Sequence, residues 1–144
     1  MIDVSVAREI AASPESVVAV MFDPTSDPRW MKAVTRSEPL DGSFAIGSRV
    51  RRHARFLARD ISWITVVTAY EPTRRLELRI DEGPFTGAVC YTITATTGSN
   101  VEIRNVGTPG KFAWMPTALV RHAMQRALAK DLHRLAATVE TVRS

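Results

Sequence analysis

The chain has 144 residues and a mass of 15.9 kDa, with 45% hydrophobic and 24% charged residues. This composition excludes intrinsic disorder as the main description, and the length predicts a single domain over residues 1–144 with room for a core and an internal pocket. The formal net charge is +4, and because the basic residues are spread along the chain we expect no nucleic-acid partner.

The first predicted element is a half-buried strand over residues 2–11, where apolar and polar residues alternate with a period of two. A helix is predicted to follow. Residues 13–16 supply its start, with a capping serine, a proline at the first helical position and an acid near the positive end of the helix dipole. Apolar residues 17–22 continue this helix, and an Asp-Pro pair ends it. Residues 25–31 then predict a second short helical segment that carries Trp30.

The middle of the chain is predicted to be an antiparallel meander, because apolar segments alternate with short turn signals rich in Gly, Pro, Asp and Ser. Six strands are expected here, over residues 34–38, 48–56, 61–70, 76–80, 85–96 and 101–106.

One long amphipathic helix is predicted over residues 116–142, where aliphatic residues recur at steps of three and four. At 1.5 Å per residue it is about 40 Å long. A helix of that length needs an apolar partner, and the concave face of a strongly curved sheet is the only large candidate. A helix packed across such a sheet leaves space between the two.

Several segments resemble the helix-grip superfamily, which includes START lipid-transfer domains, birch-pollen-type allergens and the bacterial polyketide cyclase/dehydrase group (SRPBCC). The segments are Ser13-Pro14-Glu15-Ser16-Val17, Phe22-Asp23-Pro24 through Trp30, Gly47-Ser48-Arg49-Val50, Tyr70 to Leu76, Gly83-Pro84-Phe85 and the leucine-spaced last helix. The resemblance implies an α+β fold in which a curved antiparallel sheet of about seven strands wraps around a long C-terminal helix. Two short helices follow the first strand.

The resemblance also implies an elongated apolar cavity between the sheet and the long helix. We expect aromatic residues and small or aliphatic residues of the last helix to line it, namely Trp30, Trp63, Phe85, Tyr91, Phe112, Trp114, Leu119, Ala123 and Ala127. The alternative is that the tryptophans serve ordinary packing and that the alanines only allow the helix to approach the sheet closely.

Arg52 is the most unusual polar residue of the predicted sheet, because it shares a strand face with apolar neighbours. It must reach a carboxylate, a ligand anion or solvent at a strand end. Arg104 and Asn105 raise the same question, with Glu102 as a possible partner for Arg104. The weak catalytic candidates are Arg52, Asp60 and Tyr91, since none of them belongs to a motif with known mechanics.

No metal and no cofactor are expected, because the chain has one cysteine and three scattered histidines without ligand spacing. The N-terminus has no signal-peptide pattern and no segment has the apolar length of a membrane span. We therefore expect a cytoplasmic monomer or homodimer without integral membrane association.

The function expected from the sequence is binding of a hydrophobic small molecule, such as a lipid, a sterol or a polyketide, for transport or sequestration. An alternative is a polyketide cyclase, aromatase or dehydratase that uses the same cavity. A second alternative is a chaperone-type module that binds a protein partner.

Overall fold

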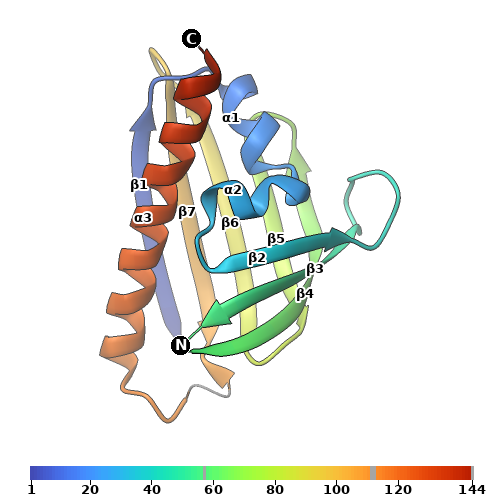
Figure 1. Ribbon diagram of the computed structural model, residues 1–144, viewed down its shortest axis with the longest axis vertical. Helices are drawn as coiled ribbons and strands as arrows, with labels where there is room; N and C mark the ends of the chain where they lie inside the picture. The colour runs from blue at the N-terminus through green and yellow to red at the C-terminus, as the bar shows by residue number, and fades with distance from the viewer. Residues whose placement is uncertain (57, 111–112, 144) are drawn as a thin grey trace.

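The computed structural model describes residues 1–56, 58–110 and 113–143, and within them seven antiparallel strands form one curved sheet (Figure 1). The strand order is β1-β7-β6-β5-β4-β3-β2. The strands are β1 (Ile2–Ile10), β2 (Val34–Pro39), β3 (Arg49–Phe56), β4 (Arg59–Glu71), β5 (Arg75–Glu82), β6 (Thr86–Ala95) and β7 (Ser99–Thr108). The helices are α1 (Pro14–Met21), the 3₁₀ helix η1 (Pro24–Ser26), α2 (Asp27–Trp30) and α3 (Thr117–Arg143). The predicted α+β helix-grip architecture is confirmed.

Local chemistry sets the ends of the short helices. The Ser13 hydroxyl accepts a hydrogen bond from the Ser16 N–H at 3.2 Å and caps α1. The predicted second helical segment is divided into η1 and α2. Pro28 has no N–H to donate to the Pro24 carbonyl, and the Asp27 N–H bonds to that carbonyl instead, which closes a 3₁₀ turn.

The main core fills one end of the space between the sheet and α3. There α1, α2 and the C-terminal half of α3 lie over the sheet, in the upper half of Figure 1. Trp30 and Leu135 are fully buried at the centre of this core, and Tyr91 is 4% exposed. At the other end the N-terminal half of α3 covers the sheet, through a small cluster of Ile2, Val4 and Val120.

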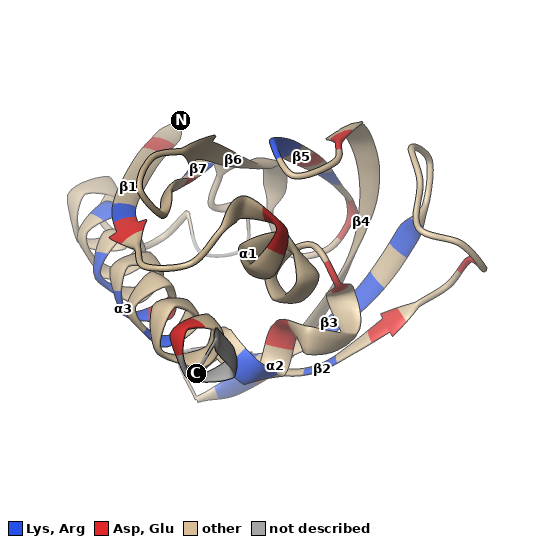
Figure 2. Ribbon diagram, turned by 90° about the horizontal axis from the view of Figure 1, so that it is seen from above, with Lys and Arg blue, Asp and Glu red and all other residues tan. Residues whose placement is uncertain are grey.

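None of the helices in the described part of the chain is long and apolar enough to cross a membrane. The outer side of α3 carries basic residues instead (Figure 2). Arg121, Arg126 and Lys130 are exposed there, together with His122 and His133.

Edge strand β1 is joined to β7 on the outer face of the sheet by an ion pair. Arg104 donates two hydrogen bonds to the Asp3 carboxylate, at 3.0 and 2.6 Å. Asp3 on the neighbouring strand is therefore the hydrogen-bonding partner of Arg104, and Glu102, the possible partner named from the sequence, makes no such bond in the described structure. The hydrogen bonds from Arg104 hold the pKa of Asp3 below its ordinary value.

Replacement of the Asp3 carboxylate by an amide should make the free energy of unfolding less dependent on pH. A lowered pKa means that the Asp3 charge stabilises the fold above the unfolded pKa of about 3.9 and that this stabilisation is lost as the pH falls through the folded pKa. We expect Asp3→Asn to lower the melting temperature at pH 7 and to match the unmodified protein in the acid limit. Thermal melts across pH 2–7 check this, with Glu82→Gln at the exposed end of β5 as the control; an equal loss at both ends of the range would contradict it.

Candidate ligand-binding pocket

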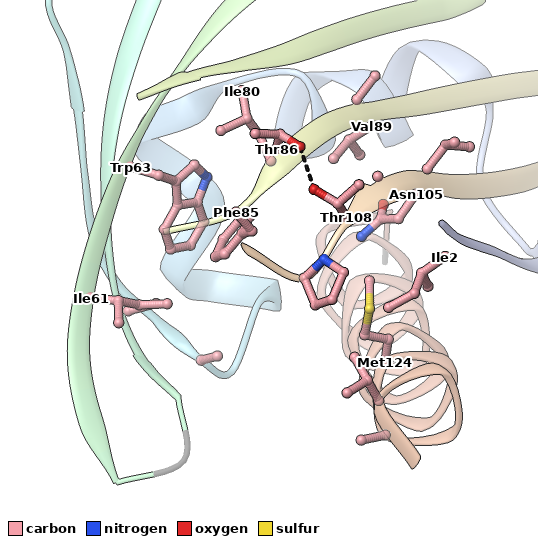
Figure 3. A pocket seen from close by; sticks show the side chains of 18 of the residues that line it. Ile2, Ile61, Trp63, Ile80, Phe85, Thr86, Val89, Asn105, Thr108 and Met124 are labelled. Carbon is pink, nitrogen blue, oxygen red and sulfur yellow. Dashed lines mark hydrogen bonds between the residues drawn. The ribbon is translucent and has the colours of Figure 1, made fainter. Parts of the chain in front are cut away.

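A pocket of about 270 Å³ lies between the N-terminal half of α3 and the adjacent ends of strands β3 to β7 (Figure 3). Most of its lining is apolar. Trp63 and Phe85 lie on one side with their ring centroids 5.6 Å apart, and Ile2 and Met124 lie on the other. Ala123 is exposed to solvent and also lines the pocket, so it lies at the mouth.

Small residues keep this end of the fold hollow. Gly87 and Gly107 face each other on β6 and β7, where a Cβ atom on either would lie 2.2 Å or less from a carbonyl oxygen of the opposite strand. Only glycine permits this close approach, and neither residue places a side chain in the pocket. Ala54 and Ala123 line the pocket with a single methyl group each. The pocket therefore exists where the sequence places glycine and alanine on the facing surfaces of the sheet and α3.

The polar side-chain groups of the described lining come mainly from β6 and β7. The hydroxyls of Thr86 and Thr108 bond to each other at 2.6 Å across the two strands. Asn105 lies beside them, and its buried side-chain oxygen has no hydrogen-bond partner in the described structure. No described lining residue carries a side chain that titrates near neutral pH, so this lining supplies hydrogen bonds but no general acid or base.

Three of the residues expected at the cavity line the pocket, namely Trp63, Phe85 and Ala123. Trp30 and Tyr91 lie instead in the filled core at the other end of the sheet, with their rings 5.9 Å apart. These two side chains belong to the main core, in space that the expected elongated cavity would include, and they do not line this pocket.

The remaining expected lining residues lie elsewhere. Trp114 is 77% exposed and Leu119 is 52% exposed, and Ala127 also faces solvent. Phe112 lies outside the described residues. Positions 119, 123 and 127 drift around a helix of 3.6 residues per turn by about 40° at each four-residue step. This drift turns the two outer positions away from the pocket, and the helix contributes Val120 and Met124 beside Ala123.

The sequence left three possible partners for Arg52, namely a carboxylate, a ligand anion or solvent. In the structure the partner is a carboxylate. The Nε atom of Arg52 donates a hydrogen bond to Asp27 Oδ2 at 2.7 Å, and its Nη1 atom donates to the Thr65 hydroxyl. Ser37 donates to the same carboxylate oxygen at 3.1 Å. Both charged side chains are almost completely buried. Burial raises the pKa of Asp27, because desolvation outweighs the attraction of Arg52.

This cluster fixes α2 to β3, and none of its members lines the pocket. The other two catalytic candidates also lie outside the pocket lining. Asp60 is exposed and pairs with Arg55 at 3.3 Å. Burial raises the pKa of the Tyr91 hydroxyl, which keeps this group protonated inside the core.

Asn105 was visible in the sequence as a polar residue on the last strand, but it was not selected as a lining residue. The useful signal is its position in a period of two, because Val101 and Ile103 precede it on the same face and are buried. Thr86 and Thr108 carried no comparable signal, since hydroxyl residues are ordinary at strand ends.

A curved sheet that grips a long helix over an apolar pocket defines the helix-grip class of folds. The sequence matches, over residues 1–140, the family described as "Polyketide cyclase / dehydrase and lipid transport", and the chain belongs to this family. The predicted membership of the polyketide cyclase/dehydrase group is thereby confirmed. No curated protein matches the sequence significantly.

Solved structures share the fold at low sequence identity. The protein TTHA0849 from Thermus thermophilus is 21% identical over 99% of both chains, with a TM-score of 0.83. A START superfamily protein from Mycobacterium smegmatis is 19% identical over 97% of this chain and 98% of its own, with a TM-score of 0.79. The protein CV1439 from Chromobacterium violaceum is 18% identical over 97% and 99%, with a TM-score of 0.76. At these identities the likeness establishes the architecture alone.

The buried ion pair predicts a large loss of stability when one partner is removed. Arg52→Met leaves the Asp27 carboxylate buried without its cation and should cost about 3–5 kcal/mol in the free energy of unfolding, measured by urea denaturation. Arg51→Met removes an exposed arginine from the next position and should stay within about 0.5 kcal/mol. The double variant Asp27→Leu/Arg52→Met should lose less than the sum of the two single variants. Equal effects of Arg52→Met and Arg51→Met would contradict the role assigned to the pair.

Proposed function

We propose that the chain binds a hydrophobic small molecule in the pocket between α3 and strands β3 to β7. The observation that carries this proposal is an apolar hollow of about 270 Å³ at one end of the fold, beside the main hydrophobic core at the other end. Protein interiors pack to a density near 0.75 and leave few voids larger than a water molecule, so a hollow of this size needs a reason. Occupation by an apolar guest supplies one.

The volume limits the size of the guest. An engineered cavity of about 150 Å³ holds one benzene ring, and pockets for drug-sized ligands start at roughly 300 Å³. A volume of about 270 Å³ therefore suits a molecule of one or two rings, or an aliphatic chain of similar bulk. A sterol or a full-length polyketide would have to project through the mouth beside Ala123.

Binding relies on removal of apolar ligand surface from water, worth about 0.8 kcal/mol for each buried methylene group. Trp63 and Phe85 offer flat faces for an aromatic guest, and offset or tilted ring contacts add to the burial. We infer binding and not turnover, because the described lining holds hydroxyl and amide groups but no side chain suited to proton transfer.

A variant that fills the mouth tests this proposal. Ala123→Trp projects a large ring where the pocket opens and should weaken the binding of 2-methylnaphthalene by about tenfold or more, measured by fluorescence titration. Ala127→Trp, on the same helix one turn later and facing solvent, should bind within about twofold of the unmodified protein.

Native mass spectrometry of the freshly purified protein provides an independent measurement. A co-purifying small-molecule mass should be retained in Ala127→Trp and reduced in Ala123→Trp. Failure of the unmodified protein to bind 2-methylnaphthalene, or equal binding by both variants, would overturn the proposal.

A further inference from the structure

Exposed apolar side chains lie at the pocket end of the molecule. Five large hydrophobic side chains are exposed in the described part of the chain, and three of them are Met1 at 84%, Trp114 at 77% and Leu119 at 52%. Each of the three immediately precedes a residue that lines the pocket, namely Ile2, Met115 and Val120. Those lining residues pack in one cluster, so their exposed neighbours share one end of the fold, where Figure 1 shows the N-terminus beside the start of α3.

The helix α3 continues this surface with a stripe of exposed residues. Their spacing of four, three and four residues places them on one face of the helix, and they are Leu119, Ala123, Arg126 and Lys130. Ala123 also lies at the mouth of the pocket. The stripe therefore leads from an exposed leucine, past the mouth, to two cations.

The two cations of the stripe have no acidic partner. Neither Arg126 nor Lys130 forms an ion pair with a carboxylate of the residues that the structure describes. Residues 113–130 contain three Arg or Lys residues and no Asp or Glu. The next acid, Asp131, is half-buried and accepts a hydrogen bond from the Lys32 N–H at 3.3 Å. Arg126 and Lys130 thus present positive charge next to exposed apolar side chains.

We propose that this surface docks on a bilayer containing anionic lipids, with Trp114 and Leu119 in the membrane–water interface and Arg126 and Lys130 against the headgroups. Tryptophan suits that interface because its ring is apolar and its N–H is polar. Arginine and lysine near an anionic bilayer add an attraction that acts within a Debye length. Docking in this way holds the mouth beside Ala123 against the lipid phase, which is a source of apolar guests. The docking goes beyond the proposed function and does not require a bound guest.

Co-sedimentation with lipid vesicles tests the docking. The protein without added ligand should bind vesicles of phosphatidylcholine with about 30% phosphatidylglycerol, and should bind pure phosphatidylcholine at least about tenfold more weakly. Binding to the anionic vesicles should fall in about 1 M NaCl, where charges are screened beyond about 3 Å. Arg126→Gln/Lys130→Gln should weaken it by about 20-fold, since each cation near the surface contributes about fivefold. The matched control is Arg8→Gln/Arg51→Gln, which removes two exposed cations from β1 and β3 and should stay within about twofold.

The apolar part of the surface has its own variants. Trp114→Ala should weaken binding to the anionic vesicles by about tenfold, because less apolar surface enters the interface. Leu119→Gln provides a second, smaller removal on α3. Ile46→Ala is the control, since it truncates a side chain that is 66% exposed in the β2–β3 connection, and it should stay within about twofold. Vesicles with brominated acyl chains should quench the tryptophan fluorescence of the unmodified protein, and most of this quenching should be lost in Trp114→Phe.

The outcomes separate the docking from the proposed function. Absence of binding to the anionic vesicles, equal binding to both vesicle types, or equal losses in the variants and their controls would overturn the docking. If vesicles are not bound and Trp114→Ala instead dissociates a dimer, the surface joins two copies of the chain, which also overturns it. Binding of 2-methylnaphthalene in solution should stay within about twofold in Trp114→Ala, because Trp114 does not line the pocket. Failure of the unmodified protein to bind 2-methylnaphthalene would overturn the proposed function and leave the docking standing.

Discussion

Large side chains fill the interior between the sheet and α3 unevenly. The helix α3 runs beside β1 along the length of the sheet (Figure 1), and large side chains such as Trp30 and Leu135 fill the end where α1 and α2 also lie. At the other end Ala54, Gly107 and Ala123 line a hollow. The packed end supplies the apolar burial that holds the helix on the sheet, which allows the other end to remain open at a tolerable cost in stability.

The packed end also contains the buried ion pair between Asp27 and Arg52. The short helix α2 has only four residues and cannot hold its place by its own hydrogen bonds. Trp30 anchors it through burial, and Asp27 anchors it through the buried contact with Arg52 on β3. A buried ion pair adds little net stability but strongly penalises any arrangement that separates its charges. Arg52 therefore specifies where α2 lies and, through it, which end of the interior is closed.

The order of elements, the antiparallel meander and the long last helix were predictable from the sequence, because alternation of period two and steps of three and four report directly on buried faces. The site was less predictable. Trp30 and Tyr91 were expected to line the cavity, but large aromatic side chains also fill space, and these two belong to the main core. The pocket depends on the lack of a side chain at Gly107. It also depends on which residues of α3 face the sheet, and local sequence patterns predict neither feature.

The size of the hollow limits how a guest could be chosen. A purely apolar pocket discriminates weakly between guests of similar shape, since an extra methyl or hydroxyl changes its contacts only slightly. Volume and ring shape would therefore decide more than single polar contacts. A hollow of about 270 Å³ suits one or two rings, and a larger guest would have to project past Ala123 at the mouth. Substitutions at the mouth or at the faces of Trp63 and Phe85 are thus the changes that would alter which guest fits.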